Sequence, residues 1–391
     1  MKPLRLVMVT RRFWPLADEV ERTLARLAVE LSARGCRTTI VTTRWLARWP
    51  EKIRVMDLPV VRLSPPPEGR WNRWLAMRAL AQWLRRNQDD FDLVYVAGLR
   101  HEAYAAIRAL RGRRPVVLWA PRTGRDGDCF WQLDAAGGRK IKNQCMHAAA
   151  FAATTPAIRR ELEAAGYPRP RIHELPLGIA AGPPRTPAAR AAARALLVEA
   201  NLSLQLAERA PLVVSIGRLE PARGWEDLVA AWPAIAGRWP NARLWLSGET
   251  PDRAILQRQI ESLGLTGRVV PVGVFEDLEG LLAAADLLVA PSIEGTPVAL
   301  LEAMAAGLPT VASDVPAHRW LIADGREGLL VPKGNAASLS AAIARLLAEP
   351  DLAERLGAAA QQRAVREFPL ARMAEEHLAL FHALRCAAAR S

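Results

Sequence analysis

The chain has 391 residues, of which 51% are hydrophobic and 24% are charged, a composition typical of a folded globular protein and not of a disordered one. Such a length suggests two or three domains. Lys and Arg number 53 against 40 Asp and Glu, and the net charge of +13 fits three kinds of partner: nucleic acid, an anionic membrane surface or a small phosphorylated ligand. A basic surface with no dedicated partner is the fourth interpretation.

The cysteines and the apolar runs narrow the cellular setting. Cys36, Cys129, Cys145 and Cys386 lie far apart with no CxxC pair, which argues against a zinc site or a disulfide framework and favours a reducing cytoplasm. The first apolar run is too short and too interrupted by Arg for a signal peptide. No stretch has the roughly 18 apolar residues of a spanning helix. We therefore expect a cytoplasmic protein, free or bound peripherally at the inner face of the membrane.

The first half of the chain predicts one doubly wound α/β domain. Leu4–Thr10 has the short apolar run of a buried strand, Val20–Arg34 repeats apolar residues at helical spacing, and Thr38–Thr43 reads as a second strand. Strand, helix and strand in succession form a βαβ unit, which implies a parallel sheet. Further strands are predicted at Leu93–Ala97, Val116–Trp119 and Ala148–Thr154.

A second α/β series follows a boundary rich in Pro and Gly and a helix-prone connector between residues 178 and 210. Its predicted strands are Leu212–Ile216, Arg243–Ser247, Val269–Val272, Leu287–Ala290, Thr310–Ala312 and Gly328–Val331. The α/β pattern thus predicts two Rossmann-like domains, residues 1–180 and 181–370, that face each other across a cleft. A last helix at about 371–391, after Pro369, is expected to cross back onto the first domain. Ligands of open α/β sheets bind at the carboxyl ends of the strands, which here would border the cleft.

Two glutamates flank a predicted helix start after the strand Leu287–Ala290. Glu294 lies in the loop, and Glu302 lies about one turn inside a helix that begins near Pro297, because proline is welcome in a first turn. The amides of the loop and of that turn form an anion site. A carboxylate such as Glu302 beside it suits vicinal ribose hydroxyls, which it can accept in pairs. The alternative is that both glutamates only cap the helix and compensate its dipole.

A second motif follows the strand Leu212–Ile216 and has the sequence GRLEPARG, from Gly217 to Gly224. Glycine at the end of a strand permits close approach of the backbone. Arg218 and Arg223 can converge on a diphosphate, since arginine is a fixed cation with a bidentate fork. The alternative is a pair of solvated loop arginines in an Arg-rich chain.

Together the two motifs resemble those of a known family. SIGRLEPARG is similar to the G-R-L-x-x-x-K-G element of glycosyltransferase family 4, and PSIEGTPVALLEAMAAGLPTVASD is similar to its E-x7-E block. The segments around both motifs agree as well, so the resemblance covers nearly all of residues 210–370. It implies a GT-B fold and a retaining transferase that uses a nucleotide-sugar donor and needs no metal or other cofactor.

The resemblance also implies roles for the motif residues. Arg218 and Arg223, the latter in place of Lys, would act in catalysis by neutralising the diphosphate leaving group, with Glu294 as the third catalytic residue at the donor sugar. Such arginines replace a divalent cation because they stabilise the charge that develops on the leaving oxygen. Glu302 would hold the ribose. The residues expected to bind the donor are Gly217, Glu294, Gly295, Thr296, Val298 and Glu302.

The first domain departs from the family pattern in its opening loop. RFWPLADEVER aligns with the family's P-x-x-G-G-x-E-R, so Asp18 and Glu19 occupy the positions of two glycines in the acceptor and loop region, followed by Arg22. Two anions near a diphosphate, at an effective dielectric constant of about 20, cost on the order of a few kcal/mol unless they are countered. Arg11, Arg12 and Arg22 are candidate counterions.

Two further departures lie on the acceptor side. Pro121 stands where many members have a histidine, and Leu177 replaces the Asn of a P-N-G sequence. His101 lies nearby in sequence but not at the motif. Two interpretations follow: an active enzyme that moves a sugar to a hydroxyl of a glycan or lipid-linked acceptor, or a degenerate protein that binds nucleotide or glycan without transfer.

One predicted helix, residues 70–86 (RWNRWLAMRALAQWLRR), combines Trp with Arg. Helical spacing puts Trp71, Trp74, Leu75 and Trp83 near one face. Basic residues beside Trp suit a helix resting on anionic lipid, which would place a lipid-linked acceptor nearby. The alternative is a helix packed on the core with exposed Arg. No nucleic-acid-binding motif accompanies the charge, so nucleic acid is not an expected partner.

Overall fold

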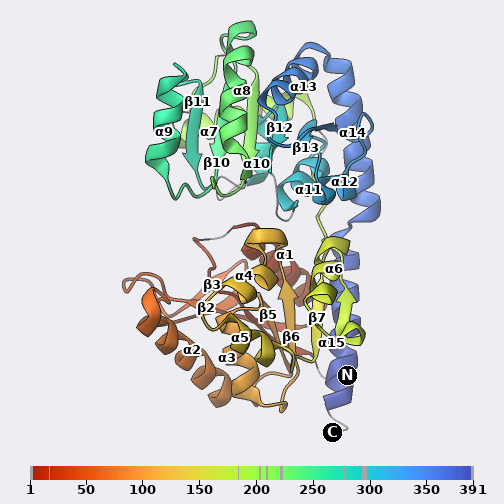
Figure 1. The fold of residues 1–391 in the computed structure, drawn as a ribbon. Coiled ribbons are helices and arrows are strands. Elements are labelled where there is room, and N and C mark those ends of the chain that lie inside the picture. Colours follow the sequence, from red (N-terminus) through yellow and green to blue (C-terminus); the bar gives the residue numbers. More distant parts are fainter. Residues whose placement is uncertain are drawn as a thin grey trace. The chain divides into compact units, whose positions relative to one another are not determined.

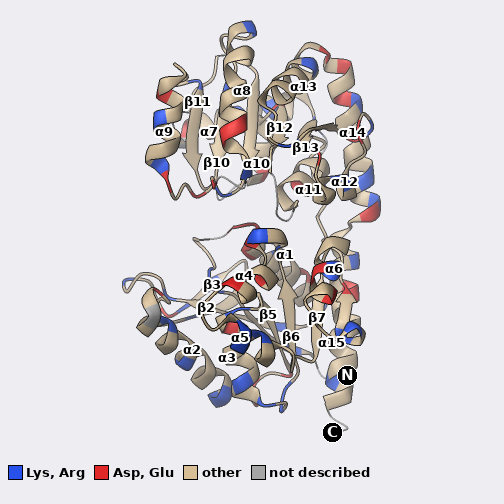
Figure 2. Cartoon of the chain, in the orientation of Figure 1, with Lys and Arg blue, Asp and Glu red and all other residues tan. Residues whose placement is uncertain are grey.

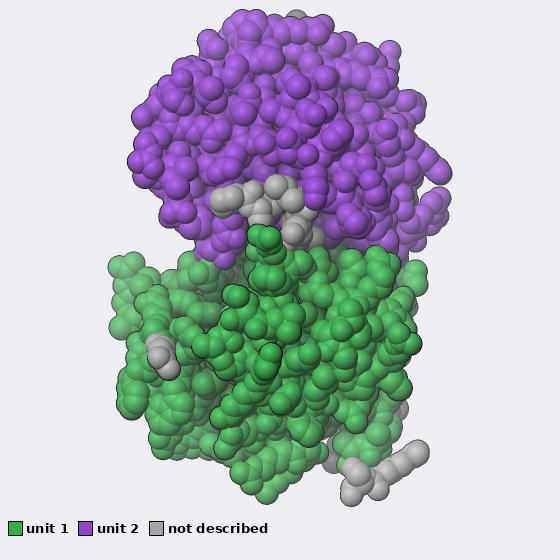
Figure 3. Space-filling model, viewed as in Figure 1, with its two compact units in different colours: residues 1–178, 370–391 green, residues 179–369 purple. Residues whose placement is uncertain are grey.

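The computed structural model describes residues 3–16, 18–183, 185–201, 204–207, 210–220, 223–275, 278–292 and 297–388. The chain divides into two compact units (Figures 1 and 3). Unit 1 comprises residues 1–178 and 370–391, and unit 2 comprises residues 179–369. Each unit has a mainly parallel β-sheet with helices packed on it, so the fold class predicted from the sequence, two Rossmann-like α/β domains, is confirmed.

Unit 1 is built around an eight-stranded sheet. Its strands are β1 (Arg5–Val9), β2 (Arg37–Thr43), β3 (Lys52–Val55), β4 (Leu58–Leu63), β5 (Leu93–Ala97), β6 (Val116–Ala120), β7 (Ala150–Ala153) and β8 (Ile172–Glu174). Its α-helices are α1 (Glu19–Ala33), α2 (Gly69–Arg86), α3 (His101–Leu110), α4 (Asp128–Asp134), α5 (Gly138–Cys145), α6 (Pro156–Ala164) and α15 (Leu370–Ala388). The short 3-10 helices η1 (Gly124–Asp126) and η2 (Arg169–Arg171) complete it.

The strand order in unit 1 is β3-β4-β2-β1-β5-β6-β7-β8, and only β3 runs antiparallel to its neighbour. The chain therefore starts at β1 in the middle of the sheet, moves outward on one side and returns to add β5 on the other. The gap between the loops that follow β1 and β5 is a topological switch point, where α/β sheets place their ligands. Three of these strands, β3, β4 and β8, were not predicted from the sequence.

The unit 1 sheet is covered on both faces. Alternate residues of β1 and β5 point to opposite sides, as strand geometry requires. Val7, Val9, Val94 and Val96 pack with helices α2, α3, α5 and α6 in one core. Leu6, Met8, Leu93 and Tyr95 pack with α1 and α15 in the other. The last helix of the chain is thus part of the core of unit 1, although unit 2 precedes it in sequence.

Unit 2 has a six-stranded parallel sheet. Its strands are β9 (Leu212–Ile216), β10 (Arg243–Ser247), β11 (Val269–Gly273), β12 (Leu287–Ala290), β13 (Thr310–Ser313) and β14 (Leu329–Val331). Its helices are α7 (Pro187–Ala200), α8 (Trp225–Arg238), α9 (Arg253–Ser262), α10 (Leu278–Ala284), α11 (Val298–Ala305), α12 (Pro316–Leu321), α13 (Ala336–Ala348) and α14 (Pro350–Glu367). All of these strands agree with the sequence prediction to within one residue at each end.

The strand order in unit 2, β11-β10-β9-β12-β13-β14, is that of a Rossmann sheet with its switch point between β9 and β12. The loop after β9 begins with Gly217, and the loop after β12 leads to α11. Both motifs of the sequence analysis therefore leave the sheet at the same place. The topology brings together segments that are some seventy residues apart in the sequence.

Several helices begin where the sequence supplies a capping side chain. Such a side chain accepts a hydrogen bond from an otherwise unpaired amide of the first turn. The residues that do this are Asp18 for α1, Thr155 for α6, Thr186 for α7 and Asn335 for α13. In α6 and α7 a proline follows the cap directly, which suits the first helical position.

Candidate functional site

The carboxyl ends of β9 and β10 pack with no room for side chains. Gly217 has φ of 144° and Gly248 has φ of 150°, conformations that favour glycine. A Cβ on Gly248 would lie 1.8 Å from the carbonyl oxygen of Gly217. The amide of Gly217 donates to the carbonyl oxygen of Ser247 at 2.9 Å. The backbone before Arg218 is thus fixed by its neighbour on the adjacent strand.

A second glycine contact joins the two motif loops. Gly224 has φ of 66° and precedes α8, and a Cβ there would lie 2.1 Å from the carbonyl oxygen of Pro291, just after β12. Only glycine allows this approach. It places the loop that carries Arg218 and Arg223 directly against the segment that leads into α11. The loop after β9 and the start of the segment that leads from β12 into α11 therefore meet at the switch point of unit 2.

Arg218 is held by two carboxylates in this site. Its Nη2 lies 2.9 Å from Oε1 of Glu220, and its Nε lies 3.6 Å from Oε2 of Glu249. About a quarter of its side chain is exposed, so a ligand at the strand ends can reach it. Neither Glu220 nor Glu249 was predicted from the sequence as a partner of Arg218. Glu220 lies in the same motif, whereas Glu249 follows Gly248 at the end of the adjacent strand and is brought close only by the sheet.

Arg223 is almost fully buried, with 8% of its surface exposed. Its amide donates to the carbonyl oxygen of Glu220 at 2.9 Å, which closes the motif into a turn. Its guanidinium group lies near His318, where burial first and then this positive charge lower the imidazole pKa to about 4. His318 is therefore neutral at neutral pH, and Nδ1 donates to the carbonyl oxygen of Ser313 at 2.7 Å.

Helix α11 begins at Val298, with Pro297 at its N-cap, as the sequence predicts. The N-cap side chain makes no hydrogen bond to this helix. The cap residue therefore gives the amides of the first turn no capping partner. Glu302 lies one turn inside and is only 3% exposed. The predicted donor residues Glu294, Gly295 and Thr296 lie outside the described residues.

In unit 1 the loop with the two acidic residues has a structural role. Asp18 is the N-cap of α1: its Oδ1 accepts from the amide of Glu19 at 2.9 Å, and Oε2 of Glu21 accepts from the Asp18 amide at 3.0 Å. This is a capping box, in which two helix-end amides are satisfied reciprocally. Oε1 of Glu21 also accepts from the Thr10 hydroxyl at 3.2 Å. The loop that would approach a ligand through two glycines here starts a helix instead.

Arg122 is a counterion of Asp18 that was not predicted from the sequence. Nη2 of Arg122 lies 3.0 Å from Oδ2 of Asp18. Burial alone would lower the pKa of Arg122, but the carboxylates of Asp18, Glu19, Glu21 and Asp128 outweigh it and raise that pKa. One feature of the sequence pointed to Arg122: it directly follows Pro121 at the end of β6, and the resemblance places a histidine at the position of Pro121.

The other acceptor-side residues are spread over the same unit. Arg11 and Arg12 lie over the Trp45 ring, with guanidinium carbons 5.7 and 5.3 Å from its centre. Arg22 lies within α1, where its amide donates to the carbonyl oxygen of Asp18 at 2.9 Å. Leu177 is buried.

Helix α2 presents tryptophan to solvent. Trp71 is 71% exposed and Trp74 is 45% exposed, and their ring centres lie 5.5 Å apart. The Arg78 guanidinium lies over Trp74 at 5.3 Å, and further basic residues follow along the helix (Figure 2). Trp83 packs instead against the core, so the prediction of one face with all three tryptophans is wrong. Trp74 lies three residues, or about 300° around the helix axis, after Trp71, so these two side chains lie near one face. Trp83 lies twelve residues after Trp71, and its side chain points about a third of a circle away from that of Trp71.

The described part of the chain contains neither a metal-binding cluster nor a membrane-spanning helix. No cluster of three or more His, Cys, Asp or Glu side chains there is arranged to hold a metal ion. No helix there is both long and apolar enough to cross a membrane.

Family models match the chain in both units. The model of glycosyl transferases group 1 matches residues 210–349, and that of glycosyltransferase family 4 matches residues 20–181. Among curated proteins, the lipopolysaccharide core biosynthesis glycosyltransferase LpsE of Rhizobium meliloti (strain 1021) is 32% identical over 172 residues, which are 44% of this chain and 49% of that protein. The chain thus spans about half the length of the curated relatives it matches.

Solved structures share the fold over nearly the whole chain. Sucrose-phosphate synthase from Thermosynechococcus elongatus has a TM-score of 0.79 at 22% identity, covering 98% of this chain and 100% of that one. Anabaena Alr3699/HepE in complex with UDP-glucose has a TM-score of 0.77 at 19% identity, covering 97% and 100%. At such identities the likeness shows the fold alone. Together with the family matches in both units, it shows that the chain belongs to the family 4 type of glycosyltransferases with the GT-B fold.

Proposed function

We propose that the protein moves a sugar from a nucleotide-sugar donor to a hydroxyl of a glycan or lipid-linked acceptor, with retention at the anomeric carbon and without a divalent metal. The observation that carries this proposal is the contact between Gly224 and Pro291. It holds Arg218 and Arg223 against the segment leading to α11, at the switch point where a Rossmann sheet binds its ligand.

The chemistry needs positive charge at the leaving group. The bond between the anomeric carbon and the diphosphate oxygen breaks, the acceptor oxygen bonds to that carbon on the same face, and the acceptor proton passes to the leaving phosphate oxygen. Arg218 and Arg223 would stabilise the negative charge that develops there, usually the largest contribution in such sites. Glu302 would accept the two ribose hydroxyls of the donor.

Glu220 and Glu249 give Arg218 a defined orientation before the donor arrives. A guanidinium group has five donors, so Arg218 can keep one carboxylate while a diphosphate takes its free N–H groups. Preorganised charges of this kind need no reorientation during the reaction. The carboxylates at 2.9 and 3.6 Å would thus position the arginine without neutralising its role.

An anionic membrane surface is the partner that the exposed face of α2 fits. Trp71 and Trp74 offer amphipathic rings, and Arg78 offers positive charge beside them. Cosedimentation with phosphatidylcholine vesicles, with and without phosphatidylglycerol, tests this: binding should need the anionic lipid and should fall in the W71A/W74A double variant. Equal binding by this variant and the wild type would contradict it. A lipopolysaccharide-type acceptor, as the name of the relative LpsE suggests, is consistent with such a surface.

Donor binding can be tested by thermal unfolding with UDP, GDP, ADP and their sugar conjugates, starting with UDP-glucose. A ligand at about 100 times its dissociation constant adds roughly 2.7 kcal/mol to the free energy of unfolding. The shift should appear with one nucleotide and be much reduced in E302A. The matched control is R253A, since Arg253 begins α9 and is exposed.

Turnover separates a transferase from a protein that only binds. In the presence of an acceptor, R218A should lower kcat by about 100- to 1,000-fold, the usual effect of removing one such charge. R253A should leave kcat unchanged, and EDTA should leave the wild-type rate unchanged. Equal turnover of R218A and wild type would show that Arg218 does not stabilise the leaving group. Donor binding without transfer to any acceptor would favour the degenerate binding protein.

A further inference from the structure

The carboxyl edge of the unit 2 sheet holds a buried histidine that lies outside both sequence motifs. His318 belongs to α12, the helix that follows β13, and only 4% of its surface is exposed. Helix α12 packs beside α11 (Figure 1), and β13 is the neighbour of β12 in the sheet. His318 therefore lies at the same edge of the same sheet as the motif loops that follow β9 and β12.

The imidazole of His318 has a defined tautomer. Its Nδ1 lies 2.7 Å from the carbonyl oxygen of Ser313, and because a carbonyl oxygen can only accept, Nδ1 carries the proton. Burial and then the positive charge of Arg223 lower the imidazole pKa to about 4, although the bond to Ser313 opposes them, so the ring is neutral at neutral pH. Within the described residues this is the one side-chain hydrogen bond of His318, so the lone pair of Nε2 is open to a donor.

Arg223 carries the guanidinium group that lies near this imidazole. It precedes Gly224, whose close contact with Pro291 brings the loop after β9 across to the end of β12. Because β12 lies between β9 and β13 in the sheet, the same contact brings this loop toward α12. Among the charged side chains that the structure describes, Arg223 is the one whose charge acts on His318. Arg223 is itself only 8% exposed, so both side chains are enclosed by the protein.

We propose that His318 is a positioning residue for Arg223: Nε2 accepts a hydrogen bond from the guanidinium group, which then turns its other N–H groups toward the donor diphosphate. A guanidinium group has five donors, so this bond leaves the others for phosphate oxygens. A neutral imidazole orients the guanidinium group without cancelling its charge, whereas carboxylates of Glu220 and Glu249 orient Arg218 at the same edge. The inference rests on the proposed function for the diphosphate.

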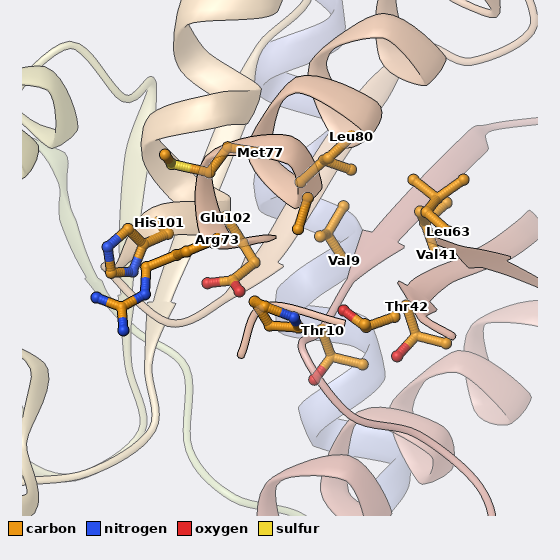
Figure 4. A pocket seen from close by; sticks show the side chains of 13 residues that line it. Val9, Thr10, Val41, Thr42, Leu63, Arg73, Met77, Leu80, His101 and Glu102 are labelled. Atoms are coloured by element: carbon orange, nitrogen blue, oxygen red, sulfur yellow. The ribbon is translucent and has the colours of Figure 1, made fainter. Parts of the chain in front are cut away.

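The pocket of unit 1 is too small to be a second place for the diphosphate. It lies between the ends of β1, β2 and β4 and the helices α2 and α3, with Arg73 and Glu102 in its lining (Figure 4). It encloses about 30 Å³, which is room for about two water molecules. A diphosphate group is larger than that, so we assign nucleotide binding to the edge of unit 2.

Two substitutions separate the two nitrogens of the ring. The amide of Asn stands about where Nδ1 stands, so H318N keeps the bond to Ser313 and loses the acceptor at Nε2. The amide of Gln stands about where Nε2 stands, so H318Q keeps the acceptor and loses that bond. Isothermal titration calorimetry with UDP, GDP and ADP measures the dissociation constants. For the nucleotide that the wild type binds best, H318N should weaken binding about fivefold to tenfold, and H318Q should stay within about twofold of the wild type.

A purely structural role predicts the reverse order. If His318 only holds Ser313, H318N should bind like the wild type, and H318Q should bind more weakly and melt at a lower temperature; that result would overturn the proposal. R319Q is the matched control, because Arg319 is the next residue of α12, its side chain is 59% exposed and it pairs with Asp314. R319Q should keep the wild-type affinity. A loss there as large as in H318N would show a general effect of changes in α12 and would also overturn the proposal.

A double-mutant cycle tests whether His318 acts through Arg223. R223A should weaken nucleotide binding more than H318N does, because it removes the charge and not only its orientation. If the imidazole acts by positioning, H318N should add no further loss in the R223A background, within about twofold. Losses that multiply would show that His318 acts on the ligand or the fold without Arg223, and would overturn the positioning role.

The same measurements separate this inference from the proposed function. If the wild type binds a nucleotide and transfers a sugar, and H318N equals it in both, the role of His318 is overturned and the proposed function stands. If the wild type binds none of the three nucleotides, the proposed function is contradicted and the positioning role falls with it.

Discussion

Asp18 connects the start of helix α1 to the end of strand β6: one carboxylate oxygen caps the helix, and the other lies 3.0 Å from Nη2 of Arg122. The two residues are 104 positions apart in the sequence. The resemblance to family 4 expects a glycine where Asp18 stands. Its replacement is accompanied here by a cap and a counterion, so the charge at this edge of the sheet is compensated within unit 1.

Two substitutions of Asp18 separate these roles. Asn caps a helix about as well as Asp, so D18N should lose only the ion pair, at a cost of about 1 kcal/mol in the free energy of unfolding, given its partial exposure. D18A should lose the cap as well and cost about 2 kcal/mol. Urea unfolding measures both. E68A is the control, since Glu68 precedes α2 without a capping hydrogen bond. A D18A variant as stable as wild type would contradict the capping role.

Glu21 should make unit 1 less stable as the pH rises. Burial, followed by the nearby charge of Asp18, raises its pKa from 4.5 to about 7. The folded state then binds more protons than the unfolded state between these values. The free energy of unfolding contributed by Glu21 is therefore greatest below pH 4.5 and falls by up to about 1.4 kcal/mol per pH unit until pH 7.

Glu21→Gln should remove this slope. Its amide can still accept from the Asp18 amide and can donate to the Thr10 hydroxyl, so the local contacts persist. The variant should exceed the wild type in unfolding free energy at pH 8 and match it at pH 4.5. E68Q, at an exposed position, should show the wild-type pH profile. A parallel profile for E21Q and wild type would show that Glu21 does not titrate in this range.

His377 should make unit 1 less stable as the pH falls, which is the opposite of the effect expected for Glu21. It lies fully buried in α15, its Nε2 accepts from the Tyr95 hydroxyl at 3.2 Å, and its Nδ1 donates to the Met373 carbonyl at 2.7 Å. Burial lowers its pKa from 6.5 to about 4. The unfolded state then binds more protons between these values, so the stability of unit 1 falls as the pH drops from 6.5 toward 4.

His377→Gln should make unit 1 less sensitive to acid. The expected wild-type loss is up to about 1.4 kcal/mol per pH unit, measured by urea unfolding between pH 4.5 and 7. H147Q, an exposed histidine of the same unit, is the control and should keep the wild-type dependence. Equal acid sensitivity in H377Q and wild type would assign the effect to other groups.

The sequence predicted the strands that are buried along their whole length. β5, β6 and β12 read as continuous apolar runs, which is typical of parallel sheets covered on both faces. It missed β4, which contains Pro59 and the buried Arg62, because a charged residue and a proline argue against a strand. The structure satisfies Arg62 from distant segments: it donates to the Trp14 carbonyl at 2.8 Å and lies over Trp49.

The candidate site was predictable only where its residues share one motif. The spacing within residues 217–224 identified Arg218 and Arg223, but not Glu249, which comes from the next strand. Arg122 was missed for the same reason. Each of these two residues follows a strand other than the one that precedes its partner, and only the parallel sheet of its own unit brings the two strand ends to one edge.

Gly248→Ala tests whether the backbone at the end of β10 positions Arg218. The new Cβ would lie 1.8 Å from the Gly217 carbonyl oxygen, so one of the two loops must move. We expect a loss of several kcal/mol in unfolding free energy and a loss of nucleotide binding, because Arg218 follows Gly217 directly. G267A is the matched control: Gly267 also has positive φ, of 76°, but no atom within 4 Å of a Cβ. It should cost only the roughly 1–2 kcal/mol of the left-handed conformation and keep nucleotide binding. If G248A kept the nucleotide affinity of G267A, the close contact of Gly248 with Gly217 would be a packing feature alone, and Arg218 would not depend on it for its position.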